Sequence, residues 1–483
     1  MAIFKNGNII TLEEKGTAQA FIVRQGKFFA IGSNDEMENL VEESEEIIDL
    51  KHKTVVPGFC DGHMHFLNYA TTKDRVNITS SRSIKELITI TQNYIKEKDI
   101  GNEEWIISRG WNDNHFEEKR LPSRYDLDKI SKNHPIIFTR VCGHIAVVNS
   151  KALEVLKITK HSEDPEGGII DKVNGEPTGI LRENALNLAL SYFPIMEKEE
   201  IKRILKGAFK DAAKVGLTTI HTDDLGQAAS LENLLAAYRE LEMEDSLPVR
   251  VTLQVFSPTI DSIKLATSLD LKSGIGSELL KIGPIKIYQD GSLGGRTAAM
   301  EEEYSDTPTK GVSIYSQKQL NELTLEAHKA GFQIAIHCIG DRAMNMILNS
   351  YENIQKECGE GDYRHTLIHC QFTDDSILEK FKKLKVVANV QPSFVMTDYP
   401  IVEKAVGGAR SEKSYAWKDI LKGGSTPTRD VRAIRYTRRA RSQSFRALRQ
   451  IKSISRRGFV GRREASRRHR APRVREKEGL RVM

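Results

Sequence analysis

An apolar run ends in a histidine at Phe332-Gln333-Ile334-Ala335-Ile336-His337. A short run of this kind, rich in isoleucine, predicts a buried strand of a parallel sheet. Similar runs recur from residue 54 onward and alternate with segments of helical periodicity, such as 198–214 and 317–330. This alternation indicates a parallel α/β fold, which is either a (β/α)8 barrel or a doubly wound sheet. The expected strands are 54–56, 106–108, 136–139, 217–220, 249–253, 282–287, 332–336, 366–368 and 386–390.

The first 56 residues have a different pattern. Short β-prone runs at 2–4, 8–12 and 20–23 are separated by turns, some of which contain glycine. They predict a small antiparallel, β-sandwich-like domain ahead of the main one. The expected domains are 1–56, a main domain at 57–422 and a tail at 423–483.

Polar residues stand at or near the ends of several expected strands. His337 and His369 each end one, Lys286 lies within one, and His63 and His65 follow the first strand of the main domain. Residues i and i+2 of an extended chain share a face, so His63 and His65 can bind one cation together. Singly, a strand-end histidine is more often a hydrogen-bonded rim residue, and a strand lysine more often pairs with a buried carboxylate. Together, at the carboxyl ends where barrels build active sites, these residues favour a barrel with a metal site.

A motif that resembles the first strand of the amidohydrolase superfamily occurs at Val55-Val56-Pro57-Gly58-Phe59-Cys60-Asp61-Gly62-His63-Met64-His65. Further blocks, in the same order, resemble the subgroup called amidohydrolase 3 or YtcJ-like, which includes N-substituted formamide deformylases. The resemblance covers roughly residues 1–422 and implies a (β/α)8 barrel with an inserted subdomain at about 75–190. The matching blocks are 109–113, 142–150, 175–180, 286–294, 336–341 and 368–371.

The resemblance implies a role for each matched residue. His63 and His65 would bind a first metal ion, and His337 and His369 would complete a second position. Lys286 would be N-carboxylated, which turns a costly buried ammonium into an anionic bridging ligand. The implied cofactor is a divalent metal, zinc before others, as one or two ions. With Lys286, His337 and His369 as catalytic residues, a metal-activated water would hydrolyse an amide or formamide-like C–N bond of a small molecule.

Three residues on the matched segments are candidates for substrate contact, namely Trp111, His144 and Asp290. Each also has a structural explanation: a packed aromatic for Trp111, a capping imidazole for His144, and the ordering of a loop for Asp290. Glu183 and Asp341 are candidates for carboxylates that support the metal ligands, although a helix N-cap explains Asp341 nearly as well.

The chain departs from the family pattern near residue 426. The superfamily ends its eighth strand in an aspartate that binds metal and acts as general base and acid. Here Thr426 stands at that place, in Gly423-Gly424-Ser425-Thr426, and nothing beyond it matches. If the tail is genuine as written, we expect a barrel without its last strand and with little or no hydrolase activity.

The tail at 423–483 also has its own composition. It holds 18 Arg and 2 Lys against 4 acidic residues, a formal charge of +16, while the other 422 residues carry −10. Three explanations are open: a basic arm for nucleic acid or an anionic membrane, a disordered extension, or a shifted reading frame. We favour the shifted frame, because codons for 432–440 can be chosen so that a one-base shift reads as a family-like segment.

Other features narrow the class of protein. No apolar run reaches about 18 residues, the N-terminus lacks a secretory pattern, and the five cysteines are dispersed. We therefore expect a cytoplasmic enzyme with a small-molecule substrate and with no nucleic-acid or membrane partner, and we leave a homodimer open. The alternative is a regulatory protein that controls extracellular enzyme production in a bacterium, without catalysis, because the eighth-strand aspartate is missing.

Overall fold

The computed structural model describes residues 1–12, 16–42, 44–73, 75–141, 145–165, 168–190, 192, 196–225, 230–424 and 434–436. The chain divides into two compact units. The first contains residues 1–60 with 212–219, and the second contains residues 61–211 with 220–440.

Two small sheets make up most of the N-terminal 55 residues. The larger has the order β5-β4-β1-β6, in which β1 pairs antiparallel with β4 and parallel with β6. The smaller, β3-β2-β7, also has one antiparallel and one parallel pair. The expectation of a purely antiparallel sheet is therefore wrong, because the returning strands β6 and β7 run alongside β1 and β2. The elements are β1 (Ala2–Lys5), β2 (Asn8–Ile10), β3 (Thr17–Ala18), β4 (Ala20–Arg24), β5 (Lys27–Gly32), α1 (Asn34–Glu38), β6 (Glu46–Asp49) and β7 (Thr54–Val55).

The main domain is built on a sheet with the strand order β20-β19-β18-β17-β16-β15-β14-β8. Every neighbouring pair from β15 to β20 is parallel. Seven of the strands form a nearly closed barrel sheet, which confirms the predicted fold class. The strands are β8 (Phe59–Met64), β14 (Leu217–Asp223), β15 (Arg250–Phe256), β16 (Leu280–Tyr288), β17 (Ile334–Cys338), β18 (Thr366–His369), β19 (Val387–Val390) and β20 (Ile434–Tyr436).

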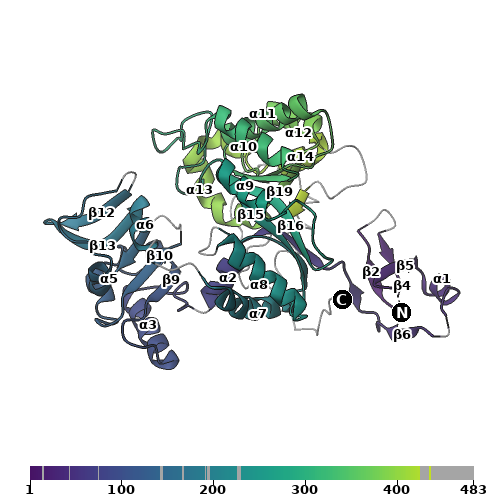
Figure 1. Ribbon diagram of the computed structural model, residues 1–483, viewed down its shortest axis with the longest axis horizontal. Coiled ribbons are helices and arrows are strands. Elements are labelled where there is room, and N and C mark those ends of the chain that lie inside the picture. Colours follow the sequence, from purple (N-terminus) through teal and green to yellow (C-terminus); the bar gives the residue numbers. More distant parts are fainter. Residues whose placement is uncertain are drawn as a thin grey trace, which may run out of the picture. The chain divides into compact units, whose positions relative to one another are not determined.

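Helices alternate with these strands and lie around them in Figure 1. Four of the helices begin at a polar side chain that accepts a hydrogen bond from the first turn: Ser230, Thr259, Ser316 and Asp374. Such caps satisfy backbone N–H groups that have no partner inside the helix. The helices are α2 (Phe66–Lys73), α7 (Lys198–Lys214), α8 (Leu231–Met243), α9 (Ile260–Ser268), α10 (Gln317–Lys329), α11 (Asp341–Cys358), α12 (Asp375–Leu384), α13 (Pro392–Glu412) and α14 (Trp417–Gly424).

A subdomain is inserted between α2 and α7. Its five-stranded sheet has the order β12-β13-β11-β10-β9, and an apolar cluster packs β9 and β10 against α3. The expected strands 106–108 and 136–139 lie in this sheet and not in the barrel, because apolar periodicity does not reveal which sheet a strand joins. The elements are α3 (Ile84–Lys98), β9 (Ile106–Trp111), η1 (Asp113–His115), α4 (Arg124–Leu127), β10 (Ile136–Arg140), β11 (Ile145–Val148), α5 (Ser150–Val155), β12 (Gly168–Val173), β13 (Glu176–Glu183), η2 (Asn184–Leu186) and α6 (Asn187–Leu190).

Two strand boundaries differ from the expectation. The segment 54–56 contributes β7 to the small N-terminal sheet, and the first barrel strand is β8, which contains His63. We expected no eighth barrel strand, but a short strand, β20, pairs in parallel with β19 at that position. Backbone hydrogen bonds suffice for such a pair, whatever the side chains. Thr426 and the other tail residues, apart from 423–424 and 434–436, lie outside the described residues.

No helix in the described ranges is both long enough and apolar enough to span a bilayer. Among the described residues, Cys338 and Cys370 are buried free thiols, and Cys358 is an exposed one.

Candidate metal centre

The histidines predicted at the strand ends lie close together in the structure. The ring centroids of His63 and His65 are 5.3 Å apart, those of His63 and His369 are 5.7 Å apart, and those of His337 and His369 are 4.5 Å apart. They come from three strand ends, of β8, β17 and β18. Lys286 extends from β16, and its charge acts on His63, His337 and His369. The side chains proposed from the sequence as metal ligands are therefore brought to one place, and their role as ligands stays a prediction.

Burial keeps these imidazoles neutral. It lowers the pKa of His63 and His369 well below the usual value and that of His337 to about 3, and the nearby positive charge of Lys286 lowers all three further. Burial also lowers the pKa of Lys286 to about 8, although Asp223 opposes this shift. Neutral imidazoles are the form that binds a metal ion, since the protonated ring has no lone pair to offer.

Three of the histidines have one ring nitrogen held by an oxygen acceptor. His65 Nδ1 lies 2.7 Å from the Asp223 carbonyl oxygen, and His337 Nε2 lies 2.9 Å from the Gly291 carbonyl oxygen. His369 Nδ1 is hydrogen-bonded to Gln391 Oε1. Each of these nitrogens must carry the proton, so the lone pair lies on Nε2 of His65, Nδ1 of His337 and Nε2 of His369. An acceptor behind each imidazole is the usual arrangement around a bound metal.

Several buried polar atoms at this place have no hydrogen-bond partner. They are His63 Nδ1, Lys286 Nζ and Asp223 Oδ1. Leaving such groups unsatisfied in the interior is costly unless a further group binds them. Imidazole nitrogens with a lysine that can be carboxylated are suitable ligands for zinc, so the residues fit a divalent cation. No trio of His, Cys, Asp or Glu side chains among the described residues forms a ready-made metal cage.

The sequence analysis missed the aspartate pair at the end of β14. Asp223 is 2% exposed, and its Oδ2 lies 3.5 Å from Lys286 Nζ and accepts a 2.7 Å hydrogen bond from the Tyr288 hydroxyl. Asp224 is fully buried and accepts hydrogen bonds from the Leu67 amide and the Tyr238 hydroxyl. Burial raises the pKa of Asp224 to about 6. The sequence could have indicated this pair, because the two adjacent aspartates stand three and four residues after the end of the expected strand 217–220.

Strand β19 and the segment after it contribute three further residues that were not anticipated. The Asn389 side chain donates a 2.7 Å hydrogen bond to the Gly62 carbonyl oxygen, which joins β19 to β8. Gln391 supports His369, and the Phe394 ring stacks on the His369 ring at 5.2 Å and 15°. Amides and a phenylalanine have no distinctive pattern in sequence, so nothing in the chain pointed to them.

Asp290, proposed as a substrate contact, is 2% exposed and surrounded by backbone donors. Its carboxylate accepts hydrogen bonds from the amides of Ala299, Ile339 and Gly340, at 2.8 to 3.2 Å. Burial raises its pKa to about 7 in spite of these bonds. The structure therefore places Asp290 as the residue that orders two loops, with His337 Nε2 3.6 Å from its Oδ1. A substrate contact stays a prediction.

Trp111, the second proposed contact, lies in the apolar core of the inserted subdomain. It is 1% exposed, it stacks with Phe116, and its indole N–H donates to the Phe138 carbonyl oxygen. This is the placement of a packed aromatic, and substrate contact stays a prediction. His144 and the side chain of Glu183 lie outside the described residues.

Asp341, proposed as a carboxylate that supports the ligands, is the first residue of α11. It accepts a 2.8 Å hydrogen bond from the Glu301 amide and another from the Arg342 amide. Burial raises its pKa. These contacts assign Asp341 to the start of the helix and to the neighbouring loop.

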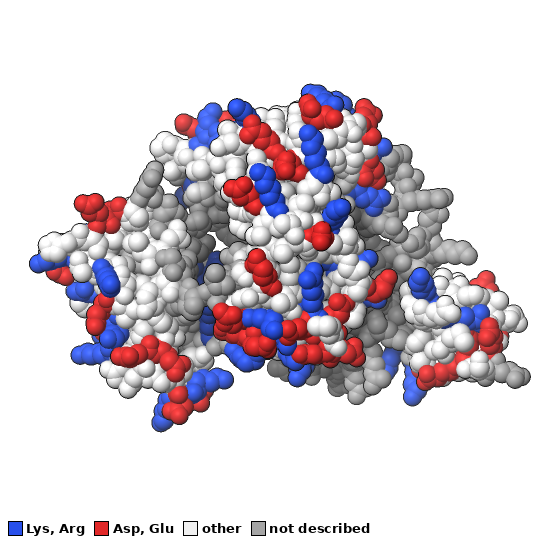
Figure 2. Space-filling model, in the orientation of Figure 1, with Lys and Arg blue, Asp and Glu red and all other residues white. Residues whose placement is uncertain are grey.

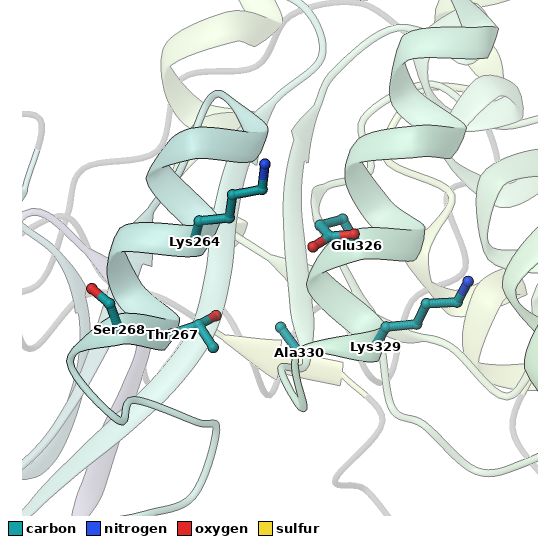
Figure 3. A pocket seen from close by; sticks show the side chains of 6 residues that line it. All are labelled: Lys264, Thr267, Ser268, Glu326, Lys329 and Ala330. Carbon is teal, nitrogen blue, oxygen red and sulfur yellow. The ribbon is translucent and has the colours of Figure 1, made fainter.

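Two surface pockets lie away from the strand ends that carry the histidines. One, of about 430 Å³, lies between α9 and α10 (Figure 3), and the exposed Lys264 lines it. The other, of about 380 Å³, lies where β17 and β18 begin, and His328 and His365 line it. The first is lined by Lys264, Thr267, Ser268, Glu326, Lys329 and Ala330. None of these six has a buried polar side-chain atom without a partner.

Charges of both signs are interspersed on the face drawn in Figure 2. On α7 and α8 they pair directly, because Lys202 lies 2.5 Å from Glu240 and 2.8 Å from Glu244, and Lys206 lies 2.7 Å from Glu244.

Comparison with known proteins adds a family to this geometry. A profile described as "Amidohydrolase family" matches residues 46–429. YtcJ of Bacillus subtilis (strain 168), whose name assigns it to the amidohydrolases, is 31% identical over 427 residues, 88% of this chain and 79% of YtcJ. An uncharacterized metal-dependent hydrolase from Pyrococcus horikoshii OT3 has a similar structure, with a TM-score of 0.71 and 28% identity over 87% of this chain and 80% of that one.

Two relatives have names that state an activity or a role. The N-substituted formamide deformylase of Arthrobacter pascens is 27% identical over 366 residues, 73% of this chain and 66% of the deformylase. The exoenzymes regulatory protein AepA of Pectobacterium carotovorum subsp. carotovorum is 27% identical over 395 residues, 79% of this chain and 83% of AepA.

Proposed function

Since the chain belongs to the amidohydrolase family, we propose that it is a metal-dependent hydrolase that cleaves an amide or formamide-like C–N bond of a small molecule. One observation carries the proposal. His63 Nδ1 and Lys286 Nζ are buried without hydrogen-bond partners, among imidazoles that are neutral. A cation would satisfy nitrogen lone pairs that have no hydrogen-bond partner in the protein.

The residues divide the work of holding that cation. His63, His65, His337 and His369 supply nitrogen donors, and the acceptors behind three of the rings fix which nitrogen of each ring carries the proton. A divalent ion there would lower the pKa of a coordinated water towards neutrality and polarise the scissile carbonyl. Zinc suits imidazole donors, and metal analysis will show whether one or two ions bind.

Lys286 completes the set if it is carboxylated. Its amine, with a pKa of about 8, is partly neutral near physiological pH, and only the neutral amine is a nucleophile. The nitrogen lone pair forms one N–C bond with carbon dioxide, one oxygen takes up the displaced π electrons, and one proton leaves the nitrogen for solvent. The product keeps one N–H and has an anionic oxygen pair in place of a buried ammonium.

Metal analysis tests the proposal. The chain, produced in zinc-supplemented medium and dialysed, should contain at least about half an ion per chain, and His63→Ala should lose it. His161→Ala, which alters an exposed histidine of the inserted subdomain, is the matched control and should keep the wild-type content. Zinc content well below that level in the wild-type chain would contradict the proposal.

Substrate class is tested on the loaded protein with a panel of N-substituted formamides, simple amides and esters. Release of formate from the formamides, with none from His63→Ala, is the expected result. We expect slow turnover, because Thr426 replaces the aspartate that serves as general base in the family.

A regulatory role is the second candidate. Two observations favour it: the similarity to a protein named as an exoenzyme regulator, and the missing general base. Deleting the gene in the organism that carries it and assaying secreted enzymes would test it. Full rescue by His63→Ala would support regulation without catalysis, and failure of that variant beside wild-type rescue would support the hydrolase.

A further inference from the structure

Asp223 contacts three members of the metal centre at once. Its carbonyl oxygen lies 2.7 Å from His65 Nδ1, and its Oδ2 lies 3.5 Å from Lys286 Nζ. The same Oδ2 accepts a 2.7 Å hydrogen bond from the Tyr288 hydroxyl. The residue is 2% exposed, at the end of β14, which neighbours β8 in the sheet.

The backbone oxygen of Asp223 lies behind His65, away from a cation bound to that ring. Because the Asp223 carbonyl oxygen faces Nδ1, the lone pair of His65 is on Nε2, on the opposite side of the ring. A metal ion bound at Nε2 would therefore have the imidazole between itself and the Asp223 backbone. The backbone oxygen of Asp223 would therefore act on the ion through His65.

The position of the Lys286 side chain also depends on Asp223. Its side chain is fully buried, and Asp223 is the one carboxylate within 4 Å of its Nζ among the residues that the structure describes. The Tyr288 ring lies on another side, with its centroid 3.4 Å from Nζ. Since the Tyr288 hydroxyl is bonded to Asp223, the three side chains form a closed triangle that restricts where Nζ can lie.

We propose that Asp223 is the positioning residue of the metal centre: it orients His65 through its backbone oxygen and anchors Lys286 Nζ through its carboxylate, with Tyr288 as the second anchor. The inference rests on the proposed function and adds to it a residue from a strand, β14, that supplies none of the five expected ligands. The inference also assigns Lys286 a contact with Asp223 both before and after carboxylation. Without metal the amine is held against Asp223, and after carboxylation the remaining N–H keeps Asp223 as its acceptor.

The neighbouring Asp224 provides a matched control. It is as deeply buried as Asp223, but its carboxylate bonds the Leu67 amide, the Thr222 hydroxyl and the Tyr238 hydroxyl, and not Lys286. Asp223→Asn and Asp224→Asn each remove one buried charge with almost no change in size. If burial of charge alone mattered, the two substitutions would have the same effect.

The experiment measures zinc affinity and lysine carboxylation, not turnover. Zinc affinity is measured by competition with a chromophoric chelator. Carboxylation is followed by carbon-13 NMR of zinc-loaded protein in labelled bicarbonate, with Lys286→Ala to identify the carbamate signal. We expect Asp223→Asn to weaken zinc binding about 10- to 100-fold and to reduce the carbamate signal, and Tyr288→Phe to have a smaller effect of the same kind. Asp224→Asn should remain within about threefold of the wild type.

Each outcome decides the inference. Wild-type affinity and carbamate signal in Asp223→Asn would overturn it, and so would equal losses in Asp223→Asn and Asp224→Asn. If Asp223→Asn does not fold, as judged by circular dichroism, Tyr288→Phe is the deciding variant, and an unchanged carbamate signal there overturns the inference. A wild-type chain that binds no zinc would instead overturn the proposed function, and this inference with it.

Discussion

Gln391 Oε1 is hydrogen-bonded to His369 Nδ1, so the residue that precedes α13 sets the tautomer of the histidine that ends β18. Gln391 is itself held, because its amide donates a 3.1 Å hydrogen bond to the Asn389 carbonyl oxygen. Both side chains are buried, at 6% and 3% exposure for His369 and Gln391. The orientation of His369 is therefore decided by a residue that cannot bind the metal.

This relationship predicts the effect of changing Gln391. Gln391→Leu leaves His369 Nδ1 without an acceptor, and zinc affinity should fall about 10- to 100-fold. Gln391→Glu should retain or strengthen binding, because a carboxylate accepts the same N–H more strongly. Chelator competition measures both variants. Gln333→Leu, at an exposed glutamine just before β17, is the control and should bind as the wild type does.

Asp290 should contribute mainly to stability. Asp290→Ala leaves the buried amides of Ala299, Ile339 and Gly340 without their acceptor, and each unsatisfied buried group costs about 1–3 kcal/mol. We expect the unfolding free energy of the metal-free protein to fall by at least about 3 kcal/mol in urea titrations. Asp306→Ala, which removes an exposed carboxylate paired with Arg296, should cost much less. A stable Asp290→Ala protein with altered substrate affinity would instead favour the contact proposed from the sequence.

The second pocket provides a prediction about pH. Burial lowers the pKa of His365 to about 3, and its Nδ1 accepts a hydrogen bond from the Ile334 amide. The unfolded chain, with a usual histidine pKa, binds more protons than the folded protein between about pH 6.5 and 3. Stability from this group is thus present above pH 6.5 and is lost as the pH falls through that window. The contribution is at most about 1.4 kcal/mol per pH unit.

His365→Gln tests this sign. Urea unfolding of the metal-free wild type and the variant at about pH 7, 6 and 5 should show a shallower loss of stability in the variant as the pH falls. Equal slopes for the two proteins would contradict the prediction. His328 also has a lowered pKa from burial and contributes in the same direction, so some slope should remain in the variant.

Trp111 separates a packing role from substrate contact. Trp111→Ala should destabilise the inserted subdomain by about 3–5 kcal/mol, because a large buried side chain is lost, and Trp111→Phe should cost less. Denaturant unfolding with a probe in the subdomain measures this change. Near-wild-type stability together with a raised KM would identify Trp111 as a substrate contact and contradict its assignment to the core.

Much of the architecture was predictable, because it depends on local patterns. The apolar runs that end in His337 and His369 became β17 and β18, and the i, i+2 spacing placed His63 and His65 at the end of β8. The same local evidence also predicted the strands at 106–108 and 136–139, but it did not show that they pair in the sheet of the inserted subdomain. Periodicity reports that one face of a strand is buried, and it carries no information about which sheet buries it.

The amino-acid sequence alone determined the parallel barrel and the kinds of ligand atom at its strand ends, because hydrophobic period and residue chemistry act over a few neighbouring residues. Only the tertiary structure decided which nitrogen of each imidazole is free and what holds Lys286. Those outcomes depend on contacts of a few ångströms between residues far apart in the chain: Asp223 with His65 and Lys286, Gly291 with His337, and Gln391 with His369. Hydrogen bonds form only at contact distance, so these contacts arise only after folding has brought the strands side by side.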